Sequence, residues 1–501
     1  MADSGRGRGG CNHPREKGSL EKWTEARPGR WMYRHRRFTL ASALRWPGKW
    51  AGCPQKSICF ASANDHFACA RGNFGSIVGA WGRLGGTTMR NAILRRLAGP
   101  GLIFTGAAIG TSHLVQSTRA GAMFGVALLG VIVLSTLLKY PAYRFGVDYA
   151  HARGRSLLSG YRELGPWAVW LFLLAVIPLV PIVYAALGAA TAGIFAAIFG
   201  PLLPLPVMAS LVIALAAALL FAGGYRLLDR VNGVLLAFLV IATVATTVMI
   251  LPRVEWATLT DFGWTRQATA LLFIVALAGF MPNPLDVSVA LSLWKVEADR
   301  TLPEGAHPTL NEARSSFLWP YVMTTLMALC FCIMGAGVMH AQDIAPLSDA
   351  PGFAGQLVDL YREALGPSAA ALAAVAALSV MLTTVIAAID AYARTLPAAI
   401  QVLRGAEQES GTRRQYALST LALAGLSIVV LFTAMRAFTT FLDFVTSATF
   451  VVAPLLALLN YLVVTRCEMP EDARPSAAIE ALSLTGVVVM GALAVMYFVL
   501  V

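Results

Sequence analysis

The segment Phe280-Met281-Pro282-Asn283-Pro284 interrupts an apolar stretch that runs from residue 268 to residue 294. About 20 apolar helical residues are enough to cross a bilayer, so the stretch is long enough to do so. Proline lacks a backbone N–H and does not fit inside a regular helix, so we predict two half-helices joined by unwound backbone. Unwound backbone is tolerated at membrane depth only where it is buried in protein or lines a cavity.

A second interruption, Gly110-Thr111-Ser112-His113, lies within the first apolar stretch of the chain. By the same length criterion the chain contains eleven apolar spans, near residues 97–123, 125–146, 167–198, 205–223, 231–251, 268–294, 317–340, 368–393, 415–434, 438–464 and 477–501. The interrupted spans are thus the first and the sixth. Interruptions at matching positions of two halves indicate an inverted-repeat secondary transporter with its substrate site near the bilayer midplane.

We therefore predict an all-α membrane protein with about 11 transmembrane helices in a 5+5 inverted repeat, helices 1 and 6 being discontinuous. Repeat one would cover about residues 97–251, repeat two about 268–464, and an extra helix 477–501. The third span contains Pro178 and Pro181, so it is either one kinked helix or a helix with a re-entrant piece.

Loop charges predict the orientation, because cytoplasmic loops are rich in Lys and Arg. A single third span places 18 Lys and Arg residues on the side of the N-terminus and 4 on the other side. We predict an integral, multi-pass protein of the plasma (inner) membrane with a cytoplasmic N-terminus.

The composition agrees with this class: 57% of residues are hydrophobic and 13% are charged, against about 25% charged in soluble domains. The net charge of +12 could indicate a nucleic-acid partner, but residues 1–88 hold 15 Lys and Arg against 5 Asp and Glu, a net of +10. The membrane part, residues 89–501, is therefore nearly neutral, and we predict no nucleic-acid partner.

Residues 1–88 have the composition of a disordered basic tail. One interpretation is a regulatory or membrane-surface arm. A second is a zinc site, although its spacing matches no standard zinc pattern, built from Cys53, Cys59, His66 and Cys69. We favour a third, in which Met89 is the natural start and the preceding residues are dispensable.

The stretch from Gly99 to Ala122, Gly-Pro-Gly-Leu-Ile-Phe-Thr-Gly-Ala-Ala-Ile-Gly-Thr-Ser-His-Leu-Val-Gln-Ser-Thr-Arg-Ala-Gly-Ala, resembles the first helix of the Nramp divalent-metal transporters. The sixth span, with Ala278-Gly279-Phe280-Met281-Pro282, matches the Ala-x-x-Met-Pro of that family. The resemblance covers about residues 89–501. It implies the LeuT-type fold and proton-coupled uptake of manganese, iron or similar ions.

The family holds its metal with an Asp and an Asn of the first break, a Met of the sixth helix and a nearby Ala carbonyl. The resemblance carries these roles onto Gly110, His113, Met281 and Ala278, so the anionic ligand is missing. An imidazole and a thioether suit softer or borderline metals and suit magnesium or calcium poorly. A protonated His113 would instead repel cations.

Each of these residues also has a structural interpretation. His113 could cap unwound backbone beside Thr111 and Ser112, and Met281 with Pro282 could fill space before a kink. The residues after that kink fit a helix start, with an N-cap, an N1 proline and an N3 acid at Asn283, Pro284 and Asp286. Asp286 is also the carboxylate nearest the break and could replace the missing anion.

Three further charged residues are candidates for an ion or proton pathway. Arg119 is either a snorkelling anchor or a contact to Asp286 or to an anionic substrate. Asp390 has the i,i+4 spacing of an ion pair with Arg394. Asp443 has no partner nearby in sequence and could serve proton movement.

The chain has no motif of a nucleotide-binding site or of a hydrolase. We predict no enzyme activity and no cofactor; the partners are the lipid bilayer and a small inorganic ion as substrate. Two alternatives stay open: a LeuT-type transporter of a non-metal solute, and a non-transporting sensor or partner protein on the same scaffold.

Overall fold

The computed structural model describes residues 58–61, 67–70, 108–222, 225–300, 302, 307–406 and 409–501, without the side chains of 58–61, 67–70 and 225–232. The chain divides into two units, Met1–Cys69 and Ala70–Val501. Strands β1 (Ile58–Ala61) and β2 (Phe67–Ala70) pair in a two-stranded sheet. No side chain is described for residues 1–107. Three predictions, the disordered tail, the zinc site and the start at Met89, therefore stay predictions. The inner part of the first span also lies outside the described residues.

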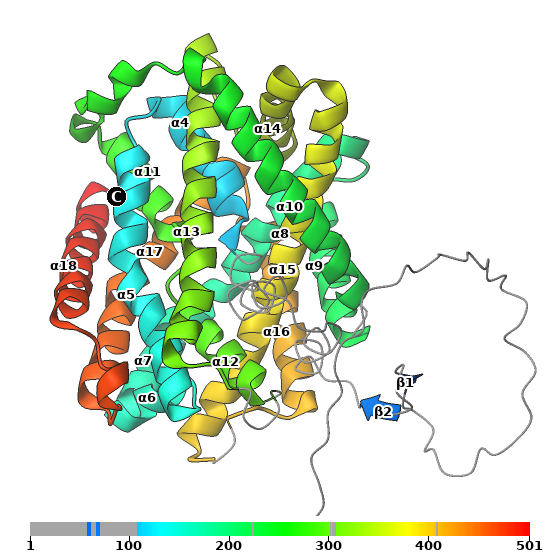
Figure 1. The fold of residues 1–501 in the computed structure, drawn as a ribbon. Coiled ribbons are helices and arrows are strands. Elements are labelled where there is room, and N and C mark those ends of the chain that lie inside the picture. The colour runs from blue at the N-terminus through cyan, green and yellow to red at the C-terminus, as the bar shows by residue number, and fades with distance from the viewer. Residues whose placement is uncertain are drawn as a thin grey trace, which may run out of the picture. The chain divides into compact units, whose positions relative to one another are not determined.

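The rest of the described chain is helical (Figure 1). The α-helices are α4 (Thr118–Phe124), α5 (Leu129–Arg153), α6 (Leu157–Leu164), α7 (Pro166–Val176), α8 (Val180–Phe199), α9 (Leu205–Ala222), α10 (Tyr225–Ile250), α11 (Ala268–Phe280), α12 (Val287–Arg300), α13 (Leu310–Met334), α14 (Ala350–Leu365), α15 (Pro367–Leu403), α16 (Arg413–Thr433), α17 (Phe438–Arg466) and α18 (Ala477–Leu500). The short 3₁₀ or π turns are η1 (Ser112–Ser117), η2 (Ile177–Leu179), η3 (Leu251–Arg253), η4 (Trp256–Thr260), η5 (Gly263–Arg266), η6 (Gly335–Met339), η7 (His340–Gln342) and η8 (Glu471–Ala473).

The helices agree with the predicted class of all-α membrane protein. Eight helical segments of the described chain are long and apolar enough to cross a bilayer. The interrupted first and sixth spans appear as η1 with α4 and as α11 with α12. The third span is one continuous segment, Pro166–Phe199, in which η2 joins α7 to α8 at the two prolines. The total of eleven crossings stays a prediction.

Two helices were not predicted, because neither is long enough to cross a bilayer. Helix α6 follows α5 directly, and α14 lies between the predicted seventh and eighth spans. In Figure 1, α4 and α14 lie toward one end of the helical unit and α6 and α12 toward the other.

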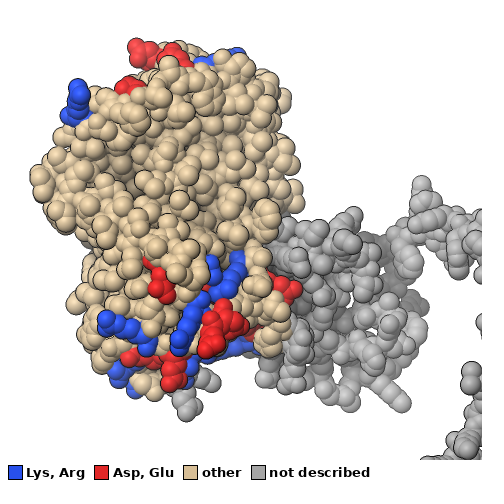
Figure 2. All heavy atoms as spheres, turned by 60° about the vertical axis from the view of Figure 1, so that its left-hand side comes forward, with Lys and Arg blue, Asp and Glu red and all other residues tan. Residues whose placement is uncertain are grey.

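Charged side chains gather at the two ends of the helical unit, and a broad band between them carries none on the face shown in Figure 2. Large apolar side chains are exposed on the helices, for example Leu174 at 71%, Trp319 at 69% and Val488 at 69%. Such a band is what a bilayer covers, because lipid solvates apolar side chains that water does not.

The outer part of the first broken helix packs closely on the seventh span. Helix α4 contacts α13 and its π-helical extension η6. Two glycines allow the helix backbones to approach this closely. A Cβ on Gly121 would lie 1.9 Å from the carbonyl oxygen of Cys332, and a Cβ on Gly335 would lie 2.2 Å from the carbonyl oxygen of Thr118. Small residues allow helix backbones to approach in membranes, so this crossing depends on both glycines.

Candidate functional site

The first break begins at Gly110, where regular helical hydrogen bonding stops. The Gly110 amide bonds back only two residues, to the Ala108 carbonyl at 2.8 Å, and the Gly110 carbonyl then accepts from the amides of His113 and Leu114. The Ser112 hydroxyl donates to the Ala108 carbonyl at 2.9 Å, which caps part of the break. The chain continues as the π-helical turn η1, all of whose residues are buried.

The second break runs from Met281 to Asp286, between α11 and α12. Our prediction of Asn283 as N-cap and Pro284 as the first helical residue is wrong, because α12 begins at Val287. Residues 284–286 form a turn instead, in which the Val287 amide donates to the Pro284 carbonyl at 3.1 Å. The carbonyls of Asn283 and Pro284 point to α5, where both accept from the Tyr143 hydroxyl at 2.8 Å.

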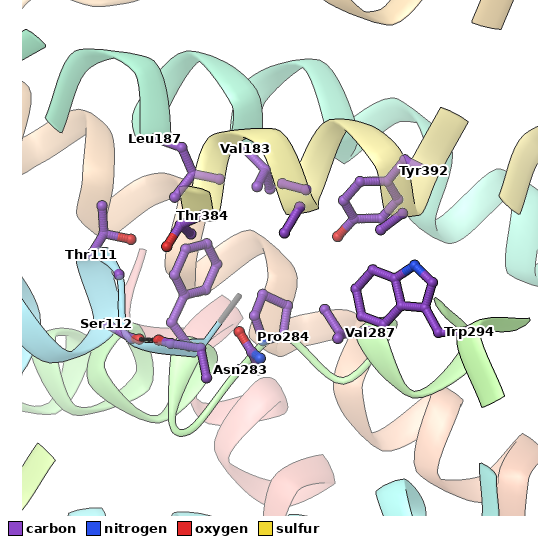
Figure 3. Close-up of a pocket in the computed structure, with 16 residues that line it drawn as sticks. Thr111, Ser112, Val183, Leu187, Asn283, Pro284, Val287, Trp294, Thr384 and Tyr392 are labelled. Carbon is purple, nitrogen blue, oxygen red and sulfur yellow. Dashed lines mark hydrogen bonds between the residues drawn. The ribbon is translucent and has the colours of Figure 1, made fainter. Parts of the chain in front are cut away.

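A cavity of about 40 Å³ lies between the two breaks (Figure 3). Thr111, Ser112, Asn283 and Thr384 bring polar groups to one end, and Trp294 and Tyr392 line the other. The remaining wall is apolar and is formed by Ala108, Gly110, Val183, Leu187, Phe280, Pro284, Val287, Ala387, Ala388 and Ala391. None of these residues carries a charge.

Two polar atoms on the cavity wall have no hydrogen-bond partner among the described residues: Thr111 Oγ1 and Asn283 Nδ2. Thr111 is 1% exposed and Asn283 is 4% exposed. Leaving such atoms unpaired costs about 1–3 kcal/mol each. They are therefore the groups of the cavity whose hydrogen-bonding capacity is available to a solute or to water.

Of the four residues expected to inherit the family's metal site, Gly110 lines this cavity, whereas His113, Met281 and Ala278 do not. His113 Nε2 donates to the Thr324 carbonyl on α13 at 2.9 Å, and Nδ1 lies 2.7 Å from the Ser112 hydroxyl. The Met281 sulfur accepts from Ser117 at 3.9 Å and packs in an apolar cluster with Phe273 and Leu277. The Ala278 carbonyl accepts from the Lys139 ammonium at 2.6 Å. Each of these three groups thus has another partner in the structure.

Asp286 lies beside the cavity rather than on its wall. Its carboxylate accepts a hydrogen bond from the Tyr392 hydroxyl, and it lines a neighbouring cavity of about 10 Å³. Tyr392 lines both cavities and thus connects the carboxylate to the larger one. Asp286 is thus a buried carboxylate in hydrogen-bond contact with a residue of the cavity wall.

Gly110, the position of the family's missing Asp, has little room for a side chain. A Cβ at this position would lie 2.9 Å from Cγ2 and 3.3 Å from Oγ1 of Thr384 on α15. Within the described residues there is also no group of three or more His, Cys, Asp and Glu side chains placed to hold a metal ion. From the described residues of its wall, a metal in this cavity would therefore meet neutral oxygen ligands only.

Arg119 and Asp443 meet, although they are far apart in the sequence. The guanidinium donates to both carboxylate oxygens of Asp443, at 2.6 and 2.9 Å, and to Gln116 at 2.8 Å. It also lies over the Phe273 ring, 5.1 Å from the centroid. Arg119 is 7% exposed, so it is a buried cross-link between α4, α11 and α17 and not a snorkelling anchor.

Asp390 forms the expected i,i+4 ion pair with Arg394, at 2.8 Å. Its carboxylate also accepts from the Trp294 indole at 3.2 Å and the Tyr416 hydroxyl at 3.0 Å. Trp294 lines the cavity, so this network fixes one of the cavity's aromatic walls.

Four residues of the site were not predicted from the sequence: Lys139, Thr384, Trp294 and Tyr392. Lys139 lies inside the apolar span 125–146, and a lysine in such a span is itself a signal of function. The other three are ordinary residues of long helices, and no local pattern separates them from lipid-facing or core positions.

The chain is thus a multi-pass helical membrane protein with two broken helices around a small central cavity. The family model described as natural resistance-associated macrophage protein-like (Nramp) matches residues 101–500. An uncharacterised protein of Pasteurella multocida (strain Pm70) is 32% identical over 376 residues, which cover 74% of this chain and 85% of that protein. The chain belongs to the Nramp family.

Solved structures show the same fold at low identity. A manganese transporter of Eremococcus coleocola, solved as a single-residue mutant, superposes with a TM-score of 0.60 at 14% identity, covering 82% of this chain and 88% of that one. MhsT, solved in complex with L-phenylalanine, has a TM-score of 0.57 at 15% identity, covering 80% of this chain and 97% of that one. The predicted LeuT-type fold class is confirmed.

Proposed function

We propose that this protein is a secondary transporter of the Nramp type, that it moves a metal ion, and that the ion occupies the cavity between the two breaks with part of its water shell. The observation that carries the proposal is the size of this cavity, about 40 Å³. A cavity needs roughly 10–15 Å³ to hold one water molecule, so this one accommodates an ion with a few waters. Pockets for drug-sized organic ligands are about 300–1,000 Å³.

The neutral wall is the reason for keeping the water shell. A bare divalent cation in a buried site requires anionic or strongly donating ligands. The hydroxyls of Thr111 and Thr384 and the amide of Asn283 are better suited to contact metal-bound water. Asp286, whose carboxylate accepts from the Tyr392 hydroxyl, is our candidate for the compensating negative charge.

A second candidate substrate is a small uncharged polar solute. It is favoured by the unpaired Thr111 Oγ1 and Asn283 Nδ2 on a wall that carries no charge. A solute with one donor and one acceptor would satisfy both atoms without the desolvation cost of an ion.

Uptake into proteoliposomes tests the proposal with manganese, iron, zinc, cadmium and magnesium. Thr111→Val removes an unpaired hydroxyl from the cavity and should reduce the flux. Thr246→Val is the matched control, because Thr246 Oγ1 is also buried without a partner but does not line the cavity. Flux of none of the five ions with folded protein would refute metal transport.

The variants Thr111→Val and Thr246→Val also test the second candidate substrate, the small uncharged polar solute. Thermal-shift measurements with small amides, ureas and alcohols should then show stabilisation of the wild type and of Thr246→Val, but less stabilisation of Thr111→Val.

We further propose that the protein lies in the plasma membrane with a cytoplasmic N-terminus and that transport is coupled to protons. Asp286, Asp390 and the Arg119–Asp443 pair are the candidate groups for proton movement. Transport at imposed pH gradients of either sign tests that coupling.

A further inference from the structure

Lys139 is a fully buried lysine of α5 whose ammonium lies against the unwound backbone of the second break. Its Nζ is 2.6 Å from the carbonyl oxygen of Ala278, 2.8 Å from that of Gly279 and 3.4 Å from that of Asn283. Helix α11 ends at Phe280, so the carbonyls of its last turn lack the usual partners four residues on. The lysine is bound to backbone oxygens that the break itself releases.

These contacts require a cation with donors in several directions. An ammonium has three N–H donors and no acceptor, which matches three carbonyl oxygens. The Phe450 ring lies on another side, with its centroid 5.9 Å from Nζ. Within the described residues, no carboxylate oxygen lies within 4.0 Å of Nζ. The ammonium is therefore held directly by backbone carbonyls and not by a carboxylate in contact with it.

The next turn of α5 also supplies a hydrogen-bond donor to the carbonyls of the second break. Tyr143, four residues after Lys139, donates its hydroxyl to the Asn283 and Pro284 carbonyls at 2.8 Å. Residues at i and i+4 share a helix face. One face of α5 thus supplies donors to the carbonyls of Ala278, Gly279, Asn283 and Pro284.

A group of backbone carbonyls converging on one point is the coordination that proteins use for dehydrated monovalent cations. We propose that the Ala278, Gly279 and Asn283 carbonyls form a monovalent-cation site and that the Lys139 ammonium fills it as a tethered cation. The wild-type protein then needs no free sodium or potassium at this break. The inference concerns the break itself and is independent of which solute the cavity carries.

Thermal unfolding of purified variants tests this inference. Lys139→Ala, Lys139→Arg and the wild type are compared in sodium, potassium, methylammonium and N-methylglucamine chlorides at equal ionic strength. The last cation is too large for the site. We expect Lys139→Ala to lose thermal stability in N-methylglucamine and to recover at least half of the loss, saturably, in sodium or methylammonium. The wild type and Lys139→Arg, which keep a tethered cation, should not respond.

Lys295→Ala is the matched control, because Lys295 is equally buried but binds a carboxylate, that of Asp299, four residues on. It should lose stability without any selective recovery by small cations. If Lys139→Ala is isolated only when sodium or methylammonium is present throughout purification, that dependence is the expected result. Equal behaviour of Lys139→Ala in all four salts, or an equal response of Lys295→Ala, would overturn the inference.

Discussion

Replacing Gly121 by alanine should force the outer part of the first broken helix away from the seventh span. The new Cβ would lie 1.9 Å from the Cys332 carbonyl oxygen and 2.7 Å from the Ala336 amide nitrogen, both of them backbone atoms. Ordinary contacts of a Cβ begin at 3.4 Å, so α4 has to move by about 1.5 Å. Backbone atoms cannot swing aside as a flexible side chain would, so the whole crossing has to adjust.

The cost can be worked from these distances. Overpacking of this kind costs about 1–3 kcal/mol, and the upper part of that range applies because the clash is with backbone. Alanine regains up to about 1 kcal/mol through its helix propensity. A net loss of about 2 kcal/mol lowers the melting temperature by roughly 2 °C, because the shift per kcal/mol becomes smaller as the folded chain becomes longer. The partner change Gly335→Ala should act on the same crossing, since its Cβ would meet the Thr118 carbonyl at 2.2 Å.

The assay is thermal unfolding in detergent with Gly425→Ala as the matched control. Gly425 lies within α16, and a Cβ there meets no atom within 4 Å. That variant should gain about 0.5–1 kcal/mol. The double change Gly121→Ala with Gly335→Ala should cost less than the sum of the two, because the first alanine already separates the helices. Equal melting temperatures of Gly121→Ala and Gly425→Ala would refute the argument.

Three further outcomes are expected. Asp443→Asn leaves the buried Arg119 guanidinium without its carboxylate and should lower the free energy of unfolding by about 1–3 kcal/mol, less than for a fully buried pair because the Asp443 side chain is 31% exposed. The control Asp359→Asn removes an ion pair whose side chains are both 57% exposed, and it should cause no measurable loss. Equal losses in the two variants would contradict the assignment of Arg119 and Asp443 as a buried cross-link. Deleting residues 1–88 should leave membrane insertion and the melting temperature unchanged, whereas a failure to insert would show that the tail is required. In that deletion variant, whose other two cysteines are buried in α13, burial raises the pKa of Cys467 to about 12. Its maleimide labelling should be slow at pH 7 and keep rising about tenfold per pH unit beyond pH 9, because only the thiolate reacts; a plateau near pH 9 would disprove the raised pKa.

Local patterns were enough to predict the two breaks. The proline-containing segment 280–284 separates α11 from α12, and the segment 110–113 coincides with the start of η1. Where a helix ends depends on residues only a few positions apart, so the end can be predicted from the sequence. The helix start after the second break was misplaced, because Tyr143 of α5 engages carbonyls that a local argument assigned to a helix.

Partners distant in sequence could not be predicted. His113 and Thr324 are 211 residues apart, and Arg119 and Asp443 are 324 apart. The partner of His113 is a backbone carbonyl, which every residue possesses, so no side-chain pattern marks it. Lys139 similarly binds carbonyls exposed by a break in another helix. The site residues implied by the family resemblance therefore stay predictions, and their contacts could not be derived from the sequence.

The sequence by itself determined the class: spans of apolar residues, two matched interruptions and an uneven distribution of loop charge are properties of segments, which lipid and backbone hydrogen bonding select locally. Only the tertiary structure decided what the breaks surround. It turned His113 toward α13, placed Lys139 on the Ala278 carbonyl and left an uncharged cavity of about 40 Å³ with two unpaired polar atoms. The reason is physical: a buried polar group takes whichever partner the packing of other helices brings within hydrogen-bond distance, and that choice is made between segments hundreds of residues apart.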